Sequence, residues 1–131
     1  MTEIFLVDDN AFMRKAMRQL IELEEGLKVC GEAGSAEDAI KILEWLKPDV
    51  ALVDISLGGN EQGIELIKYI RTKKYKFPVL TVSLHDEALY LDRVLKAGAQ
   101  GYLMKQEAPE SIIRAIHHVA AKEETFFTSA T

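Results

Sequence analysis

The feature that most restricts the fold of this 131-residue sequence is a regular alternation of short apolar runs and amphipathic stretches. The stretches between the runs repeat their apolar side chains at helical spacing, and several runs are apolar enough for strands buried on both faces. The runs are residues 4–7, 28–30, 50–53, 79–82 and 101–104. Because a helical stretch separates each run from the next, the sequence predicts a parallel sheet with helices on both faces.

Capping and turn residues fall at the boundaries that this interpretation requires. Asn10 and Ser35 are suitable N-caps for the first and second helices, and Gly98 is expected to end the fourth helix in a left-handed conformation. Only residues 123–131 lose the helical periodicity. We therefore expect one domain over residues 1–122, followed by a tail or the start of a linker.

Composition excludes several classes of protein. With 16 Lys and Arg against 21 Asp and Glu, the net charge is −5, which argues against this chain alone binding a nucleic-acid backbone. A single cysteine, Cys30, excludes an internal disulfide and indicates a reducing compartment. The first residues lack the basic region of a signal peptide, and no apolar run approaches the ~20 residues that span a bilayer. We expect a cytoplasmic domain without membrane contact.

Polar residues with complementary chemistry follow four of the apolar runs. Asp8 and Asp9 follow the first run, Asp54 the third and Ser83 the fourth, while Lys105 follows the fifth. Ligands of open parallel sheets bind at the carboxyl ends of the strands. The predicted fold therefore brings three carboxylates, a hydroxyl and an ammonium group to one edge.

Three carboxylates in one crevice resist ionisation unless a cation lies among them. Oxygen ligands of this kind suit Mg²⁺, and a carboxylate beside such an ion can attack phosphorus to form an acyl phosphate. Taken singly, each strand-end residue is more often a turn, cap or solvated side chain. Four strand ends with matching chemistry are much less frequent by chance, so the sequence predicts a site for phosphoryl transfer.

These motifs resemble the receiver domain of bacterial two-component response regulators. The resemblance rests on Val7-Asp8-Asp9-Asn10, Val53-Asp54-Ile55-Ser56, Thr81-Val82-Ser83 and the segment from Lys96 to Lys105. Ser83-Leu84-His85-Asp86 and residues 105–110 are most similar to the NarL/LuxR-type subgroup. The resemblance implies a flavodoxin-like, doubly wound α/β fold, with five parallel strands in the order 2-1-3-4-5 and five helices.

The resemblance also implies the roles of the acidic residues. Asp54 is expected to be the phosphoacceptor. Asp9 and Asp54 are expected to bind Mg²⁺ directly, Asp8 to act through water, and the backbone carbonyl of Ser56 to add a ligand.

The remaining site residues are expected to respond to the phosphoryl group. Lys105 would pair with it, while Ser83 and Tyr102 would form a switch in which the hydroxyl moves toward the phosphate and the ring turns inward. The implied phosphodonor is a sensor histidine kinase, and the chain would catalyse only its own phosphorylation and dephosphorylation. DNA would be contacted only through a C-terminal helix-turn-helix domain not present in this chain, and a homodimer is left open.

Two alternatives remain open. The first is a Mg²⁺-dependent phosphatase with an aspartate nucleophile, although Asp54-Ile55-Ser56 lacks the second acid of the usual Asp-x-Asp motif. The second is an interaction domain, either a stand-alone receiver or one that has lost phosphorylation. The sequence also departs from the common receiver pattern, because the loop from Asp54 to Gly63 is one residue longer and lacks proline, Leu84 is bulky, and Gln106 replaces a common proline.

Overall fold

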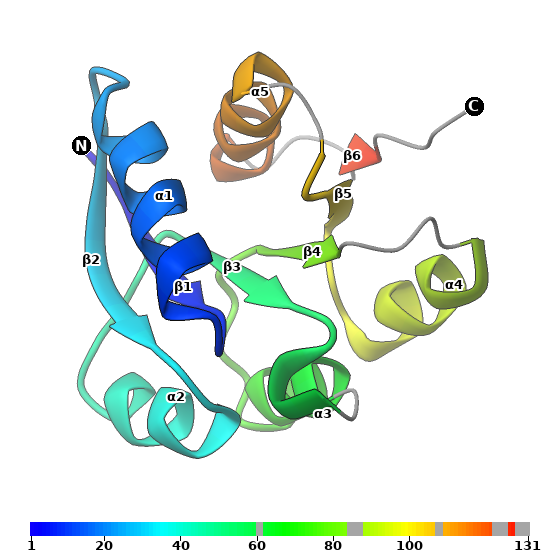
Figure 1. Ribbon diagram of the computed structural model, residues 1–131. Coiled ribbons are helices and arrows are strands. Elements are labelled where there is room, and N and C mark those ends of the chain that lie inside the picture. Colours follow the sequence, from blue (N-terminus) through cyan, green and yellow to red (C-terminus); the bar gives the residue numbers. More distant parts are fainter. Residues whose placement is uncertain (60–61, 84–87, 107–108, 122–125, 128–131) are drawn as a thin grey trace.

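The computed structural model describes residues 1–59, 62–83, 88–106, 109–121 and 126–127. The strands form a single sheet in the order β2-β1-β3-β4-β5-β6, and every neighbouring pair is parallel (Figure 1). The strands are β1 (Thr2–Val7), β2 (Leu27–Ala33), β3 (Val50–Asp54), β4 (Val79–Ser83), β5 (Gly101–Met104) and β6 (Phe126–Phe127). The helices are α1 (Ala11–Glu22), α2 (Ala36–Leu43), α3 (Gln62–Thr72), α4 (Ala88–Ala97) and α5 (Pro109–Ala120), with a short 3₁₀ turn, η1, at Leu57–Gly59.

The predicted order 2-1-3-4-5 and the five helices are confirmed. One short strand was not expected: Phe126 and Phe127 of the tail pair with Gly101 and Tyr102 of β5. Residues 84–86 and 107–108, which contributed to the subgroup resemblance, lie outside the described residues.

Two apolar layers cover the sheet, one on each face. Helices α2, α3 and α4 pack on the face that carries Phe5 and Val53, whereas α1 and α5 pack on the face that carries Leu6 and Leu52 (Figure 1). Successive residues of a strand point to opposite faces, so the central strands β1, β3 and β4 must be apolar at nearly every position. This double burial explains the near-continuous apolar runs in the sequence.

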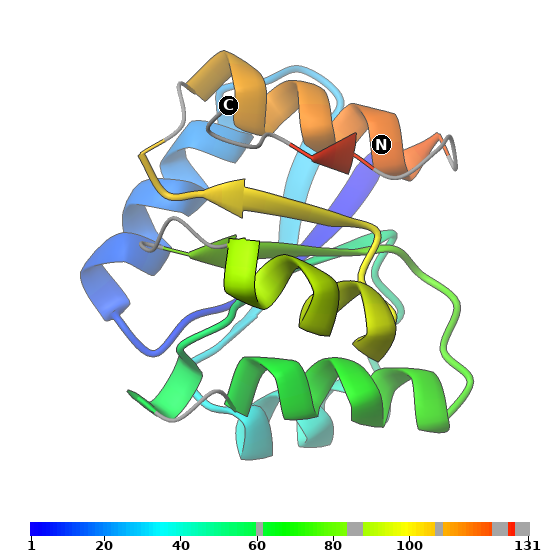
Figure 2. The same cartoon turned by 90° about the vertical axis from the view of Figure 1, so that its right-hand side faces the viewer.

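The capping predictions are confirmed, and the caps fix where the helices begin. The Asn10 side chain accepts a hydrogen bond from the Met13 N–H at 3.0 Å, and the Ser35 hydroxyl accepts one from the Asp38 N–H at 3.0 Å. Gly98 has φ = 114° directly after α4. Figure 2 shows that α1 and α3 begin on the side of the molecule to which the arrowheads of β4 and β5 point. This side is the carboxyl edge of the sheet.

Candidate metal and phosphoryl site

Three carboxylates meet at the carboxyl edge, as the sequence predicts. Asp8 and Asp9 follow the last residue of β1, and Asp54 is the last residue of β3. These two strands are neighbours, with Val7 opposite Val53 in the register. One carboxylate oxygen from each of the three aspartates lies within 4.8 Å of the others. The parallel register therefore assembles the acidic cluster from two short segments far apart in the chain.

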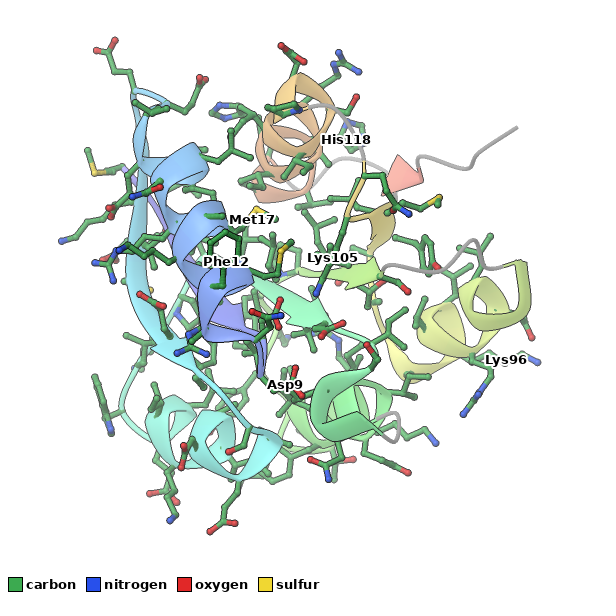
Figure 3. All side chains as sticks on the ribbon, viewed as in Figure 1. Asp9, Phe12, Met17, Lys96, Lys105 and His118 are labelled. Carbon is green, nitrogen blue, oxygen red and sulfur yellow. The ribbon has the colours of Figure 1, made fainter. Side chains whose placement is uncertain are left out.

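Lys105 joins the cluster from the end of β5. Its Nζ atom lies 3.0 Å from Asp8 Oδ2 and 3.5 Å from Asp54 Oδ2, and its side chain is only 6% exposed. Figure 3 shows the Lys105 side chain extending toward the part of the molecule where Asp9 lies. The backbone also holds this residue, because the Lys105 N–H donates to the Ser83 carbonyl at 2.7 Å. A single ammonium group thus contacts two of the three carboxylates.

Asp54 is the most enclosed of the acids, at 4% exposure. Its Oδ1 atom accepts hydrogen bonds from the Ser56 N–H at 3.2 Å and the Ser56 hydroxyl at 3.1 Å, while Oδ2 faces Lys105. Burial raises the pKa of Asp54, Lys105 opposes that effect, and Asp8 adds to it. The hydrogen bonds from Ser56 also favour the ionised form. A further cation at this position would strengthen that preference.

Backbone contacts that the sequence did not predict hold Asp8 and Asp9 in place. Asp9 Oδ2 accepts from the Gly58 N–H at 3.2 Å, and Gly58 has φ = 69°, a left-handed conformation that suits glycine. Asp8 Oδ1 accepts from the Asn10 N–H at 2.9 Å, and the Asp8 carbonyl accepts from Arg14 Nη1 at 2.7 Å. Nothing in the residue pattern marks these contacts, because most of their partners are backbone groups.

Gly63 is a further residue whose role the sequence did not show. A Cβ atom at this position would lie 2.1 Å from the Asp54 carbonyl oxygen and 2.8 Å from Ile55 Cα. The first turn of α3 therefore packs directly on the backbone that follows the candidate phosphoacceptor. The residue pattern marks Gly63 only as the end of a loop that is one residue longer than usual.

Ser83 and Tyr102 lie on neighbouring strands, and both are buried. Ser83 ends β4 and is 1% exposed, and Tyr102 of β5 is 5% exposed in the apolar layer under α2, α3 and α4. Thr81 pairs with Tyr102 in the register, so Ser83, two residues further along the same strand, faces the same side as the tyrosine ring. The ring already points inward in this structure.

The donor set fits Mg²⁺. The cluster offers only oxygen ligands, and it opens to solvent because Asp9 is exposed and the Asp8 side chain is 14% exposed. Mg²⁺ prefers a few carboxylates and retains several waters, which such an open site allows. Three carboxylates and one ammonium group leave two formal negative charges, the number that a divalent cation neutralises. The charge and the ligand type of the cluster therefore both fit a divalent cation of this kind.

Comparison with known proteins agrees with this geometry. Residues 4–117 match the response regulator receiver domain family. The nitrate/nitrite response regulator protein NarL of Escherichia coli (strain K12) is 37% identical over 122 residues, which cover 92% of this chain and 55% of NarL. The response regulator UvrY of the same strain is 35% identical, over 91% of this chain and 54% of UvrY. The chain thus spans about half the length of these curated relatives.

Solved structures give the same result. A two-component response regulator of the LuxR family from Aurantimonas sp. SI85-9A1 superposes with a TM-score of 0.90 at 30% identity, covering 99% of this chain and 91% of that one. The isolated REC domain of RcsB from Salmonella enterica serovar Typhimurium, in the presence of phosphomimetic BeF3−, gives 0.85 at 26% identity, over 97% and 93% of the two chains. Family match, relatives and fold agree: the chain belongs to the response regulator receiver domain family and is of the NarL/LuxR type.

Proposed function

We propose that this chain is a phosphorylation-dependent switch in which Asp54 accepts a phosphoryl group from a histidine of a sensor kinase, with Mg²⁺ as cofactor. The observation that carries the proposal is the buried Asp54 carboxylate, held beside Asp8 and Asp9 and 3.5 Å from Lys105. Receiver domains are signalling domains, and turnover here is limited to the chain's own phosphorylation and dephosphorylation.

The proposed transfer replaces a phosphorus–nitrogen bond by a phosphorus–oxygen bond. A carboxylate oxygen of Asp54 attacks phosphorus, the bond to the kinase imidazole breaks with its electron pair, and the imidazole nitrogen takes up a proton from solvent. Lys105, which contacts Asp54 Oδ2 before the reaction, pairs with the transferred group. Attack of water on phosphorus later releases phosphate and restores the carboxylate.

The residues proposed to hold Mg²⁺ divide between direct and water-mediated ligands. Asp9 and Asp54 would bind it directly, Asp8 would act through water, and the Ser56 carbonyl would add a further oxygen. When bound, the ion supplies charge neutralisation for the phosphoryl oxygens, which is the main requirement of phosphoryl transfer. The hydrogen bonds from Gly58 to Asp9 and from Asn10 to Asp8 orient these carboxylates before the reaction begins.

The proposed switch transmits the new charge through Ser83 and Tyr102. The Ser83 hydroxyl donates a hydrogen bond to the phosphoryl group, and the Tyr102 ring occupies the space behind it. Both residues face the side on which α4 packs, which supports a change of the α4–β5–α5 surface.

A relative that binds DNA supports a role for the whole protein in transcription. One structural neighbour is a DNA-binding response regulator of the LuxR family from Staphylococcus aureus, at a TM-score of 0.84 and 26% identity. By analogy with that DNA-binding regulator, we propose that the present protein controls transcription through a helix-turn-helix domain outside this chain. We propose that it does so in the cytoplasm. No helix in the described part of the chain is long and apolar enough to cross a membrane.

Phosphorylation by acetyl phosphate tests the assignment of Asp54. With Mg²⁺, the wild-type chain should gain the mass of one phosphoryl group, and Asp54→Ala should gain none. Asp92→Ala is the matched control, because Asp92 is an exposed aspartate on α4 paired with Lys96. Labelling of Asp54→Ala to the wild-type extent would overturn the assignment. Sustained turnover of a simple phosphate ester would instead favour the aspartate-nucleophile phosphatase.

A further inference from the structure

A basic and aromatic surface lies at the amino edge of the sheet, away from the acidic site. It is formed by the end of α2, the end of α3 and the chain that leads into β4, and we call it the amino-edge corner. Figure 2 shows the connection from α3 to β4 on the side opposite the arrowheads of β4 and β5. The corner consists of Lys47, Arg71, Lys74, Tyr75, Lys76 and Phe77.

Two pockets meet at this corner and share the Lys74-Tyr75-Lys76 segment. The first, of about 380 Å³, is lined by that segment with Arg71 and Gln100. The second, of about 350 Å³, has apolar walls from the end of α2, the segment that follows it and the segment that precedes β4, and it is bordered by lysines. Its apolar lining consists of Leu43, Leu46, Pro48, Tyr75 and Phe77, and the two aromatic rings stack at 6.0 Å. A cationic pocket thus adjoins an apolar one.

Among the described residues, the exposed lysines divide into paired and unpaired ones, and three of the unpaired kind lie at the corner. Lys47, Lys74 and Lys76 are exposed and form no ion pair with any residue in the described ranges. By contrast, three exposed lysines on helices each pair with an acid three or four residues away. These are Lys41 with Glu37, Lys68 with Glu65 and Lys96 with Asp92. Lys15, Lys28 and Lys73 are likewise exposed and unpaired within the described residues, so what marks the corner is the clustering of Lys47, Lys74 and Lys76 with Arg71. Glu44 is the one acid among the residues that line its two pockets.

Favourable placement at the ends of helices explains only part of this charge. Lysines near a helix C-terminus interact well with the helix dipole, which accounts for Lys74 after α3. Lys76 lies four residues beyond the last residue of α3, outside the range of that effect. Arg71 turns its guanidinium group to the Gly98 and Tyr75 carbonyls and to Gln100, so in the described structure no carboxylate neutralises it.

We propose that the amino-edge corner is a docking surface for an acidic peptide segment of a partner protein that carries a bulky apolar side chain. The carboxylates would lie against Lys74, Lys76 and Arg71, and the apolar side chain would enter the pocket walled by Leu46 and Phe77. Exposed charge and an adjoining apolar pocket are complementary to such a segment. A nucleic acid is a poorer match, because its phosphates would extend beyond the corner over a protein of net charge −5, whereas a short peptide places its few carboxylates on the corner alone.

Binding of a defined peptide to the full chain tests the proposal. The probe is a capped peptide with one phenylalanine between two runs of glutamate, and calorimetry gives its Kd. Trp45, the only tryptophan, is 71% exposed beside Leu46 and supplies a second, fluorescent readout. We expect saturable binding that weakens as salt is added. Replacing the phenylalanine of the probe by glycine should weaken binding several-fold.

Two triple variants with equal loss of charge separate docking from general attraction. Lys47→Gln/Lys74→Gln/Lys76→Gln should weaken binding about tenfold, as expected for the loss of three exposed charge contacts. Lys41→Gln/Lys68→Gln/Lys96→Gln should change the Kd by less than about twofold. Circular dichroism checks that both variants are folded. Equal weakening in both variants, no saturable binding, or tighter binding of an oligothymidine that depends on the same lysines would overturn the proposal.

Discussion

The carboxyl edge of the sheet encloses its charges, whereas the amino-edge corner leaves them in solvent. Asp54 and Lys105 are 4% and 6% exposed and contact each other, while Lys74 and Lys76 are exposed and unpaired within the described residues. Charges in a water-poor site interact strongly and shift each other's pKa, whereas exposed charges are screened. The first arrangement suits chemistry at a fixed atom, and the second suits attraction of a partner.

The largest expected effect tests how closely the carboxyl edge is packed. Gly63→Ala would place a Cβ atom 2.1 Å from the Asp54 carbonyl oxygen, a contact that only a shift of α3 or of the Asp54 backbone can relieve. We expect a loss of about 3 kcal/mol or more in the free energy of unfolding, measured with urea. Phosphorylation by acetyl phosphate should slow in parallel, since the same backbone positions Asp54.

Gly26→Ala is the control for adding a methyl group without a close contact. Gly26 has a left-handed φ of 91°, which Gly63 does not, and open space surrounds the position of its missing Cβ. The loss should be about 1 kcal/mol, the cost of the backbone conformation alone. Equal losses for the two variants would show that close packing at Gly63 is unimportant.

The next effect tests the contribution of a half-buried charge at the amino edge, Arg71, to stability. Arg71 donates to the Gly98 carbonyl at 2.9 Å, to the Tyr75 carbonyl at 2.8 Å and to Gln100 Oε1 at 2.8 Å, and burial lowers its pKa. Arg71→Met should lower the free energy of unfolding by about 2 kcal/mol, because the Gly98 and Tyr75 carbonyls lose this donor and Gln100 Oε1 keeps only its hydrogen bond from the Val79 N–H.

Two controls accompany Arg71→Met. Arg114→Met removes an exposed arginine of α5 and should change stability by less than about 0.5 kcal/mol. Phosphorylation of Arg71→Met, measured at a temperature where the variant is folded, should match that of the wild type. A defect in phosphorylation under those conditions would contradict the separation of the two edges.

A smaller effect, of opposite sign, is expected when the buried acid is neutralised. Burial raises the pKa of Asp54 above its ordinary value of 3.8, so the ionised carboxylate destabilises the folded state. Asp54→Asn should therefore raise the free energy of unfolding by about 1 kcal/mol at pH 7 in EDTA, since Lys105 keeps Asp8 as a partner. Asp92→Asn, which removes an exposed charge, should change it little.

The pH dependence gives this prediction a second test. A raised pKa means that the folded state binds the Asp54 proton more tightly than the unfolded state does, so this group lowers stability as pH rises from 3.8 through the folded pKa. The advantage of Asp54→Asn should be full above that range and should vanish below pH 3.8. An advantage that stays constant down to acid pH would show that the ionisation of Asp54 is not its cause.

The two edges also differ in how far the sequence predicts them. Asp8, Asp54 and Lys105 each follow an apolar run, and a parallel sheet brings such positions together whatever the loops do. The contacts of Gly58 with Asp9 and of Arg14 with the Asp8 carbonyl depend on loop and helix backbone, which residue types do not specify. At the amino edge the partners of Arg71 are mostly carbonyls as well, so its role had no sequence signal.

The smallest expected effect separates the two properties of the amino edge, its stability and its charge. Lys74 has φ = 66° and ends α3 with the same pair of hydrogen bonds that ends α4 at Gly98. In α3 they run from Lys74 N to Arg71 O and from Tyr75 N to Ile70 O, the pattern of a Schellman motif.

Lys74→Gly should raise the free energy of unfolding by about 0.5 kcal/mol, because glycine adopts this conformation without strain. The same substitution should weaken binding of the acidic peptide by about twofold, since one cation is lost. Higher stability with lower affinity would show that Lys74 is retained for its charge, whereas lower stability would show that its side chain supports the fold.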